Sequence, residues 1–135
     1  MPRRLLTTAL LAGFIAMPYQ SHASPLEPYK WKNRILVVTG PDDTAARQQR
    51  RIYETAKAGM TERQILLLEA VDDSAASRQL RTALGTDGRR FKAHLIGKDG
   101  HTAFTSDTPI SADALFDRVD AMPMRQDEMR RERSR

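Results

Sequence analysis

The sequence contains no cysteine among its 135 residues, and only 6% of its residues are aromatic. A chain without cysteine forms neither disulfides nor thiolates, so catalysis by a thiol of this chain is excluded. The sequence also has no glycine-rich phosphate loop and no serine at a recognisable nucleophile turn. Stability must therefore come from packing and hydrogen bonds, and any function from chemistry that needs no thiol.

The longest apolar run lies near the N-terminus, at 5–17, and is too short to span a membrane. A spanning helix needs about 20 apolar residues. Two arginines precede this run, and Ser21-His22-Ala23 follows it as a small-x-small cleavage site, which is typical of a secretory signal peptide. We therefore predict a signal peptide over 1–23, cleavage near Ala23, and a periplasmic or secreted protein without a stable membrane anchor. An uncleaved anchor at the membrane surface is the alternative.

The charge of the chain is modest, and we interpret it mostly as a contribution to solubility. Lysine and arginine number 22 against 17 aspartates and glutamates, which gives a formal net charge of +5. Both signs are mixed along the chain, and no basic block stands out. Because an exported protein rarely meets nucleic acid, we predict an exported protein as the possible partner and no nucleic acid.

The pattern after the signal peptide predicts one domain over 24–124 with alternating strands and helices. Residues 34–39 and 64–71 are apolar runs typical of buried strands. Each is followed by apolar residues at helical spacing, the first helix ending near Gly59 and the second near Gly85.

A hairpin and a last helix complete the domain. Residues 91–96 and 102–106 flank Asp99-Gly100, a tight-turn signal. Ser111 is a helix cap, and Pro123 is expected to end that helix.

Two flanking segments are interpreted separately. Residues 24–33 are an ordered lead-in, with Tyr29 and Trp31 packed on the domain edge. Residues 125–135 are a charged C-terminal tail, solvated and frayed.

The predicted order is β-α-β-α-β-β-α. A right-handed βαβ crossover makes the first strands parallel, and the hairpin adds an antiparallel pair. Helices that alternate with buried strands cover both faces of a sheet. We therefore predict an α/β protein with a thioredoxin-like fold and a central mixed sheet.

Four segments resemble DUF4174, a bacterial family of unknown function. They are PLEPYKWKNRILVV at 25–38, RQQRRIY at 47–53, FKAHLIGKDG at 91–100 and DAMPMRQDEMR at 120–130. KWKNR, GKDG and MPMR are the most specific parts of the match. The resemblance implies a thioredoxin-like fold related to peroxiredoxins, with relatives in animal extracellular proteins that carry sushi repeats. It implies no established activity, substrate or catalytic residue set.

The turn after the first strand is the first candidate site, because redox proteins of this fold carry their reactive cysteine there. Here it reads Thr39-Gly40-Pro41-Asp42-Asp43-Thr44. One hypothesis is a polar ligand or cation site formed by Thr39, Asp42, Asp43 and Thr44. The alternative is that the aspartates only cap the next helix.

Basic side chains on the two predicted helices form the second candidate site. Arginine forks suit carboxylates, so these residues are candidates for binding an acidic partner. The alternative is a solvated helix face with local ion pairs. The residues are Arg47, Arg50, Arg51, Arg78 and Arg81.

Metal-binding residues give only a weak signal. His94 and His101 flank the hairpin turn without a fixed third ligand. Met122, Met124 and Met129 lack the histidine or cysteine that would make a copper site, and core filling explains them more simply. We predict no metal and no cofactor.

The sequence as a whole favours an exported, non-catalytic binding or adaptor module. The alternative is a small enzyme or ligand binder with its site at the Thr39–Thr44 turn. Enzymatic activity is left open, with a non-enzymatic function favoured.

Overall fold

The computed structural model of the protein describes residues 23–135. The predicted signal peptide, apart from Ala23, lies outside the described residues, so export stays a prediction. Within this part of the chain, no helix combines the length and the apolar character needed to cross a membrane.

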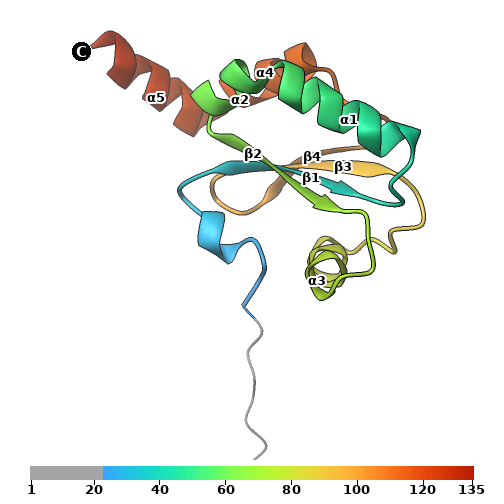
Figure 1. The fold of residues 1–135 in the computed structure, drawn as a ribbon. Coiled ribbons are helices and arrows are strands. Elements are labelled where there is room, and N and C mark those ends of the chain that lie inside the picture. The colour runs from blue at the N-terminus through green and yellow to red at the C-terminus, as the bar shows by residue number, and fades with distance from the viewer. Residues whose placement is uncertain (1–22) are drawn as a thin grey trace, which may run out of the picture.

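Four strands form one mixed sheet in the order β2-β1-β3-β4 (Figure 1). β1 is parallel to β2 and antiparallel to β3, and β4 is antiparallel to β3. The predicted parallel βαβ unit followed by an antiparallel hairpin is therefore confirmed. The strands are β1 (Arg34–Thr39), β2 (Ile65–Ala70), β3 (Lys92–Ile96) and β4 (Thr102–Ser106).

Helices cover both faces of the sheet (Figure 1). Three of them, α1, α2 and α4, lie on one face, and α3 lies on the other. Their bounds are α1 (Thr44–Thr55), α2 (Lys57–Glu62), α3 (Ala75–Leu84) and α4 (Ala112–Asp120). The helix expected to continue to Gly59 is interrupted at Ala56, where the backbone leaves helical geometry and α2 begins.

The core has two halves because β1 is buried on both faces. Leu36 and Val38 pack toward α1, α2 and α4, whereas Ile35 and Val37 pack toward α3. Apolar burial on both faces is the reason that this strand reads as a continuous apolar run. The buried side chain of Gln49 links α1 to the segment before α4. Its amide oxygen accepts from the Ile110 backbone amide at 2.7 Å, and its amide nitrogen donates to the Ile110 carbonyl at 2.9 Å.

The lead-in is ordered and Tyr29 packs as predicted, but Trp31 differs from the prediction. A short 3-10 helix, η1 (Glu27–Tyr29), packs against the α3 side of the core through Leu26 and Tyr29. Trp31 does not pack on the domain edge, because 63% of its surface is exposed. It sits at a positive φ of 67°, and its amide donates to the Lys98 carbonyl at 2.6 Å.

The interpretation of 125–135 as a frayed tail is wrong. Residues Pro123–Arg133 form a helix, α5, and Pro123 stands at its first turn rather than ending α4. Ion pairs rather than apolar contacts hold α5 against the domain. Arg125 is buried, and Glu128 pairs with the buried Arg34. Long-range ion pairs of this kind leave no periodic apolar pattern in the sequence.

Candidate functional site

Four connecting segments meet at one end of the sheet, which we call the loop end. β1 and β2 are parallel and β3 is antiparallel, so the ends of β1 and β2 lie beside the start of β3. The end of β4 joins them because Ser106 pairs with Ala93. The segments are 40–43, 71–74, 85–91 and 107–110.

The turn predicted as a polar site is used mainly to build the fold. Asp43 caps α1 by accepting from the Ala46 amide at 3.1 Å. Asp42 pairs with Arg50 at 3.2 Å, and Thr44 is exposed. Thr39 is fully buried and contacts His94. The four residues therefore point toward different partners and do not converge on one cavity.

Replacing Asp42 and Asp43 together by asparagine is expected to change the free energy of unfolding by about 1 kcal/mol or less, because asparagine also caps helices. Urea unfolding of the double variant would measure this change. If any binding activity disappeared while stability stayed the same, the aspartates would have a functional role beyond capping.

The predicted partner-binding arginines lie on opposite faces of the sheet, on α1 and on α3 (Figure 1). Several hold the loops in place. Arg47 donates to the Asp42 carbonyl at 3.1 Å, and Arg78 and Arg81 donate to the carbonyls of Asp73 and Asp72 at 2.7 and 3.0 Å. The structure thus places Arg47, Arg78 and Arg81 at the loop end without making them one continuous surface.

Arg50 and Arg51 differ in their surroundings. Arg50 pairs with Glu69 on β2 at 2.7 Å as well as with Asp42. The hydrogen bond that Arg50 donates to Glu69 raises the pKa of Arg50 further above its usual value. Arg51 is exposed on α1. Of the two, Arg51 is more open to a partner.

The turn after β2 is stiffened by hydrogen bonds to Asp72. The Ser77 hydroxyl donates to Asp72 at 2.6 Å, and the Ser74 amide donates at 3.0 Å. Hydrogen bonds from Ser74 and then Ser77 lower the pKa of Asp72 to about 2. This carboxylate therefore stays ionised at neutral pH and continues to accept hydrogen bonds from Ser74 and Ser77 within the turn.

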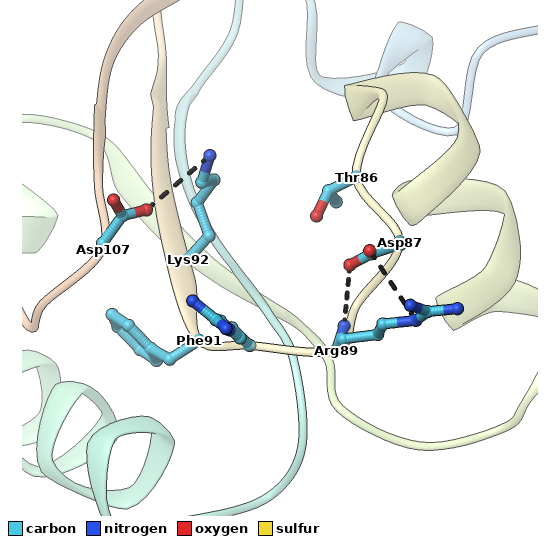
Figure 2. Close-up of a pocket in the computed structure, with 7 residues that line it drawn as sticks. Thr86, Asp87, Arg89, Phe91, Lys92 and Asp107 are labelled. Atoms are coloured by element: carbon cyan, nitrogen blue, oxygen red, sulfur yellow. Dashed lines mark hydrogen bonds and ion pairs between the residues drawn. The ribbon is translucent and has the colours of Figure 1, made fainter.

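A cavity of about 600 Å³ opens at the loop end. Figure 2 shows Lys92 extending toward Asp107, and Arg89 toward Asp87. These two ion pairs measure 3.7 and 3.8 Å. The lining residues are Thr86, Asp87, Arg89, Arg90, Phe91, Lys92 and Asp107.

The cavity wall is fixed by a close backbone contact. A Cβ at Gly40 would lie 2.7 Å from the Arg90 carbonyl oxygen, so only glycine allows the two segments to approach this closely. Phe91 is buried in the core beside this contact. The segment 89–91 therefore supports one wall of the cavity.

His94 lines a neighbouring cavity of about 350 Å³. Its Nε2 lies 3.1 Å from the Thr39 hydroxyl, and it is 3% exposed. Burial, and then the charge of Lys92, lower the pKa of His94, so the ring is neutral at pH 7.

The other side chains that were weighed as metal ligands are scattered. His101 lies at the exposed hairpin turn and faces Asp99 at 3.5 Å. Met122 packs against the core, and Met124 is exposed. Met129 is half-buried on α5. Over residues 23–135, no group of three or more histidine or acidic side chains is arranged to hold a metal ion.

Sequence reasoning missed a cluster of charged side chains at the opposite end of β1. We call it the charge cluster, and its members are Arg34, Glu62, Arg63, Lys98, Asp120, Arg125 and Glu128. Charged residues are seldom buried, so patterns do not predict such clusters. One signal was available, because KWKNR, GKDG and MPMR supply Arg34, Lys98 and Arg125.

Glu128 is the centre of one half of the charge cluster. Both terminal nitrogens of Arg34 donate to its carboxylate at 3.2 Å, and Lys98 Nζ lies 2.6 Å away. Burial raises the pKa of Glu128, but the hydrogen bonds from Lys98 and Arg34 outweigh it and hold the pKa below its usual value.

Asp120 is the centre of the other half. Arg63 donates to it through two nitrogens at 2.9 Å, and Arg125 Nε approaches at 3.2 Å. Hydrogen bonds from Arg63, and then Arg125, lower the pKa of Asp120 against the effect of burial. Arg125 also pairs with Glu62 at 3.1 Å, which ties α5 to α2.

Comparisons with known proteins identify a family and a similar fold. The family model described as "Domain of unknown function (DUF4174)" matches residues 25–128. The structure is similar to that of a reduced 2-Cys peroxiredoxin from Plasmodium vivax, with a TM-score of 0.57 and 13% identity. That alignment covers 76% of this chain and 84% of the peroxiredoxin. No curated protein matches the chain. At this identity the likeness shows a thioredoxin-like fold alone.

Proposed function

Because the chain belongs to the DUF4174 family, whose description states no function, we propose that it is a non-catalytic binding module on a thioredoxin-like scaffold. In this proposal the protein is exported through its N-terminal signal and meets its partner in the periplasm or outside the cell. The family match reaches residue 128, so the module includes the first half of α5.

One observation carries the proposal. The turn where thioredoxin-like redox proteins hold their cysteine has no thiol, and its polar side chains are engaged in capping and ion pairs. The adjacent cavity is instead rimmed by exposed charges. Exposed, loosely paired charges suit recognition of another molecule, whereas acid–base catalysis usually uses desolvated groups.

The charges of the rim favour an acidic segment of a partner protein. Arg89 and Lys92 face Asp87 and Asp107 in pairs longer than 3.5 Å and largely open to water. Such pairs contribute little energy and exchange readily for other partners. Among the described residues, Arg90 takes part in no ion pair, so its guanidinium is available to a partner carboxylate.

The proposal is tested by placing a photo-cross-linking amino acid at Thr86 in the tagged protein in its native cell. We expect one reproducible partner protein, identified by mass spectrometry. Replacing both Arg89 and Arg90 by glutamate is expected to reduce its capture about tenfold or more, since reversed charges repel an acidic segment.

Charge reversal at Arg47 and Arg51 is the matched comparison, because it makes the same change on α1 without touching the cavity. If this second variant alone abolished capture, the partner would bind α1 instead. Equal capture by the wild-type protein and both variants, or capture of no protein, would contradict the proposal.

A small-molecule binder or enzyme is the second candidate, and the Thr39–His94 contact favours it. A neutral, buried imidazole that borders a cavity can accept a proton or a hydrogen bond from a ligand. This candidate differs from the first because it needs no partner protein. A failure of the cross-linking experiment would favour it.

A further inference from the structure

A third cavity, of about 370 Å³, lies at the far end of β3 from the loop end. We call it the hairpin cavity. Its wall combines cationic side chains with apolar ones, among them Arg34, Lys98, Ala103, Met122, Pro123 and Met124. A mainly apolar lining with a few placed charges is typical of small-ligand sites, and this volume is at the small end of their range.

The two cations beside the hairpin cavity, Arg34 and Lys98, are more deeply buried than Glu128, the carboxylate that pairs with both. The side chains of Arg34 and Lys98 are 1% and 10% exposed, whereas that of their shared partner Glu128 is 19% exposed. Two cations therefore share one carboxylate. Asp99 also lines the cavity, but it is half-exposed and accepts from the His101 amide at 3.0 Å.

Two guanidinium nitrogens of the charge cluster have no hydrogen-bond partner. They are Nε of Arg34 and Nη1 of Arg125, and both are buried. The nearest carboxylate to Arg125 Nη1 is that of Glu128, at 3.8 Å. Buried donors are normally satisfied, and an orphaned one is costly. Of the two arginines, Arg34 lines the hairpin cavity and Arg125 does not. The unsatisfied atom of Arg34 is a donor, so the group that would complete this site is an acceptor.

We propose that the hairpin cavity binds a small monocarboxylate with an apolar body. Its carboxylate pairs with Lys98 and the Arg34 guanidinium, beside Glu128. Its apolar part packs on Ala103 and on the segment 122–124. This site is separate from the loop-end cavity of the proposed function, because Lys98 follows the end of β3 whereas Lys92 begins it.

Octanoate is the probe, and isothermal titration of the purified protein measures its binding. Octanol and octylammonium carry the same tail without the negative charge, so we expect saturable binding of octanoate only. Lys98→Met is expected to weaken octanoate binding about tenfold, because it removes a charged hydrogen-bond partner. Lys92→Met is the control. It makes the same change at the opposite end of β3, in a lysine that also faces a carboxylate, and should leave octanoate binding unchanged.

Met124 gives a second pair of variants that the fold tolerates, because its side chain is exposed at the rim. Met124→Glu is expected to weaken octanoate binding about threefold and Met124→Lys to strengthen it about threefold, as exposed charges contribute modestly. Absence of octanoate binding, equal binding of octanol, or equal losses in the Lys98 and Lys92 variants would overturn the proposal. Binding of a peptide through its C-terminal carboxylate without binding of octanoate would replace the small molecule by a peptide.

Discussion

Replacing Glu128 by glutamine is expected to lower the free energy of unfolding by about 3 kcal/mol or more. The substitution keeps the shape of the side chain but removes the carboxylate that Arg34 and Lys98 share. Removing one partner of a buried ion pair leaves the other charge desolvated without compensation, which costs about 3 to 5 kcal/mol. Urea unfolding followed by circular dichroism measures the loss.

The matched control lies on the same helix. Glu132 is also on α5, but its side chain is 61% exposed and its closest basic atom, Arg125 Nη1, is 4.0 Å away. Glu132→Gln is therefore expected to change stability by about 0.5 kcal/mol or less. Similar losses in the two variants would show that the charge cluster does not anchor α5.

The pH dependence of stability gives an independent check on Glu128. Its pKa in the folded protein is lowered from the usual value of 4.5. A carboxyl group with a depressed folded pKa contributes stability above its unfolded pKa, and that stability is lost as the pH falls. The wild-type protein should therefore lose stability below about pH 4.5 more steeply than the glutamine variant, because the variant has no proton to gain at this position.

The fold was predictable where the signals are local. Apolar runs identified the two parallel strands, and Ser111 accepts from the Ala114 amide as a helix cap should. Both signals depend on residues a few positions apart, so they survive without knowledge of the rest of the chain. The interruption at Ala56 carries no such signal, since alanine is a good helix former.

The candidate sites were less predictable, because long-range contacts set them. Asp43 was correctly predicted as a possible helix cap, because a capping side chain contacts only the first turn of the helix that follows it. The ion pair between Arg34 and Glu128 joins residues 94 positions apart. Nothing in either segment alone indicates that an arginine at the start of an apolar strand is neutralised by a helix at the other end of the chain. The loop-end cavity was missed for the same reason, because Asp107 and Lys92 become neighbours only when β3 and β4 pair.

Gly40 is the residue that brings the turn after β1 against the loop before β3, and Gly40→Ala is expected to lower the free energy of unfolding by about 3 to 4 kcal/mol. Two costs combine. Its φ of +126° is a conformation that residues with a Cβ rarely adopt. The new Cβ would also lie 2.7 Å from the Arg90 carbonyl oxygen and 2.8 Å from the Phe91 amide nitrogen. Both atoms belong to the backbone, so relief requires a shift of the segment itself.

Gly85→Ala separates these two costs, because Gly85 also has a positive φ, of +67°, but open space where its Cβ would point. We expect it to lose only about 1 to 2 kcal/mol, the cost of a left-handed conformation without a clash. Thermal and urea unfolding of both variants would measure the difference. Equal losses would mean that the contact between Gly40 and Arg90 adds nothing to stability. A larger loss at Gly40, together with weaker capture of the partner, would show that the same contact supports both the fold and the wall of the loop-end cavity.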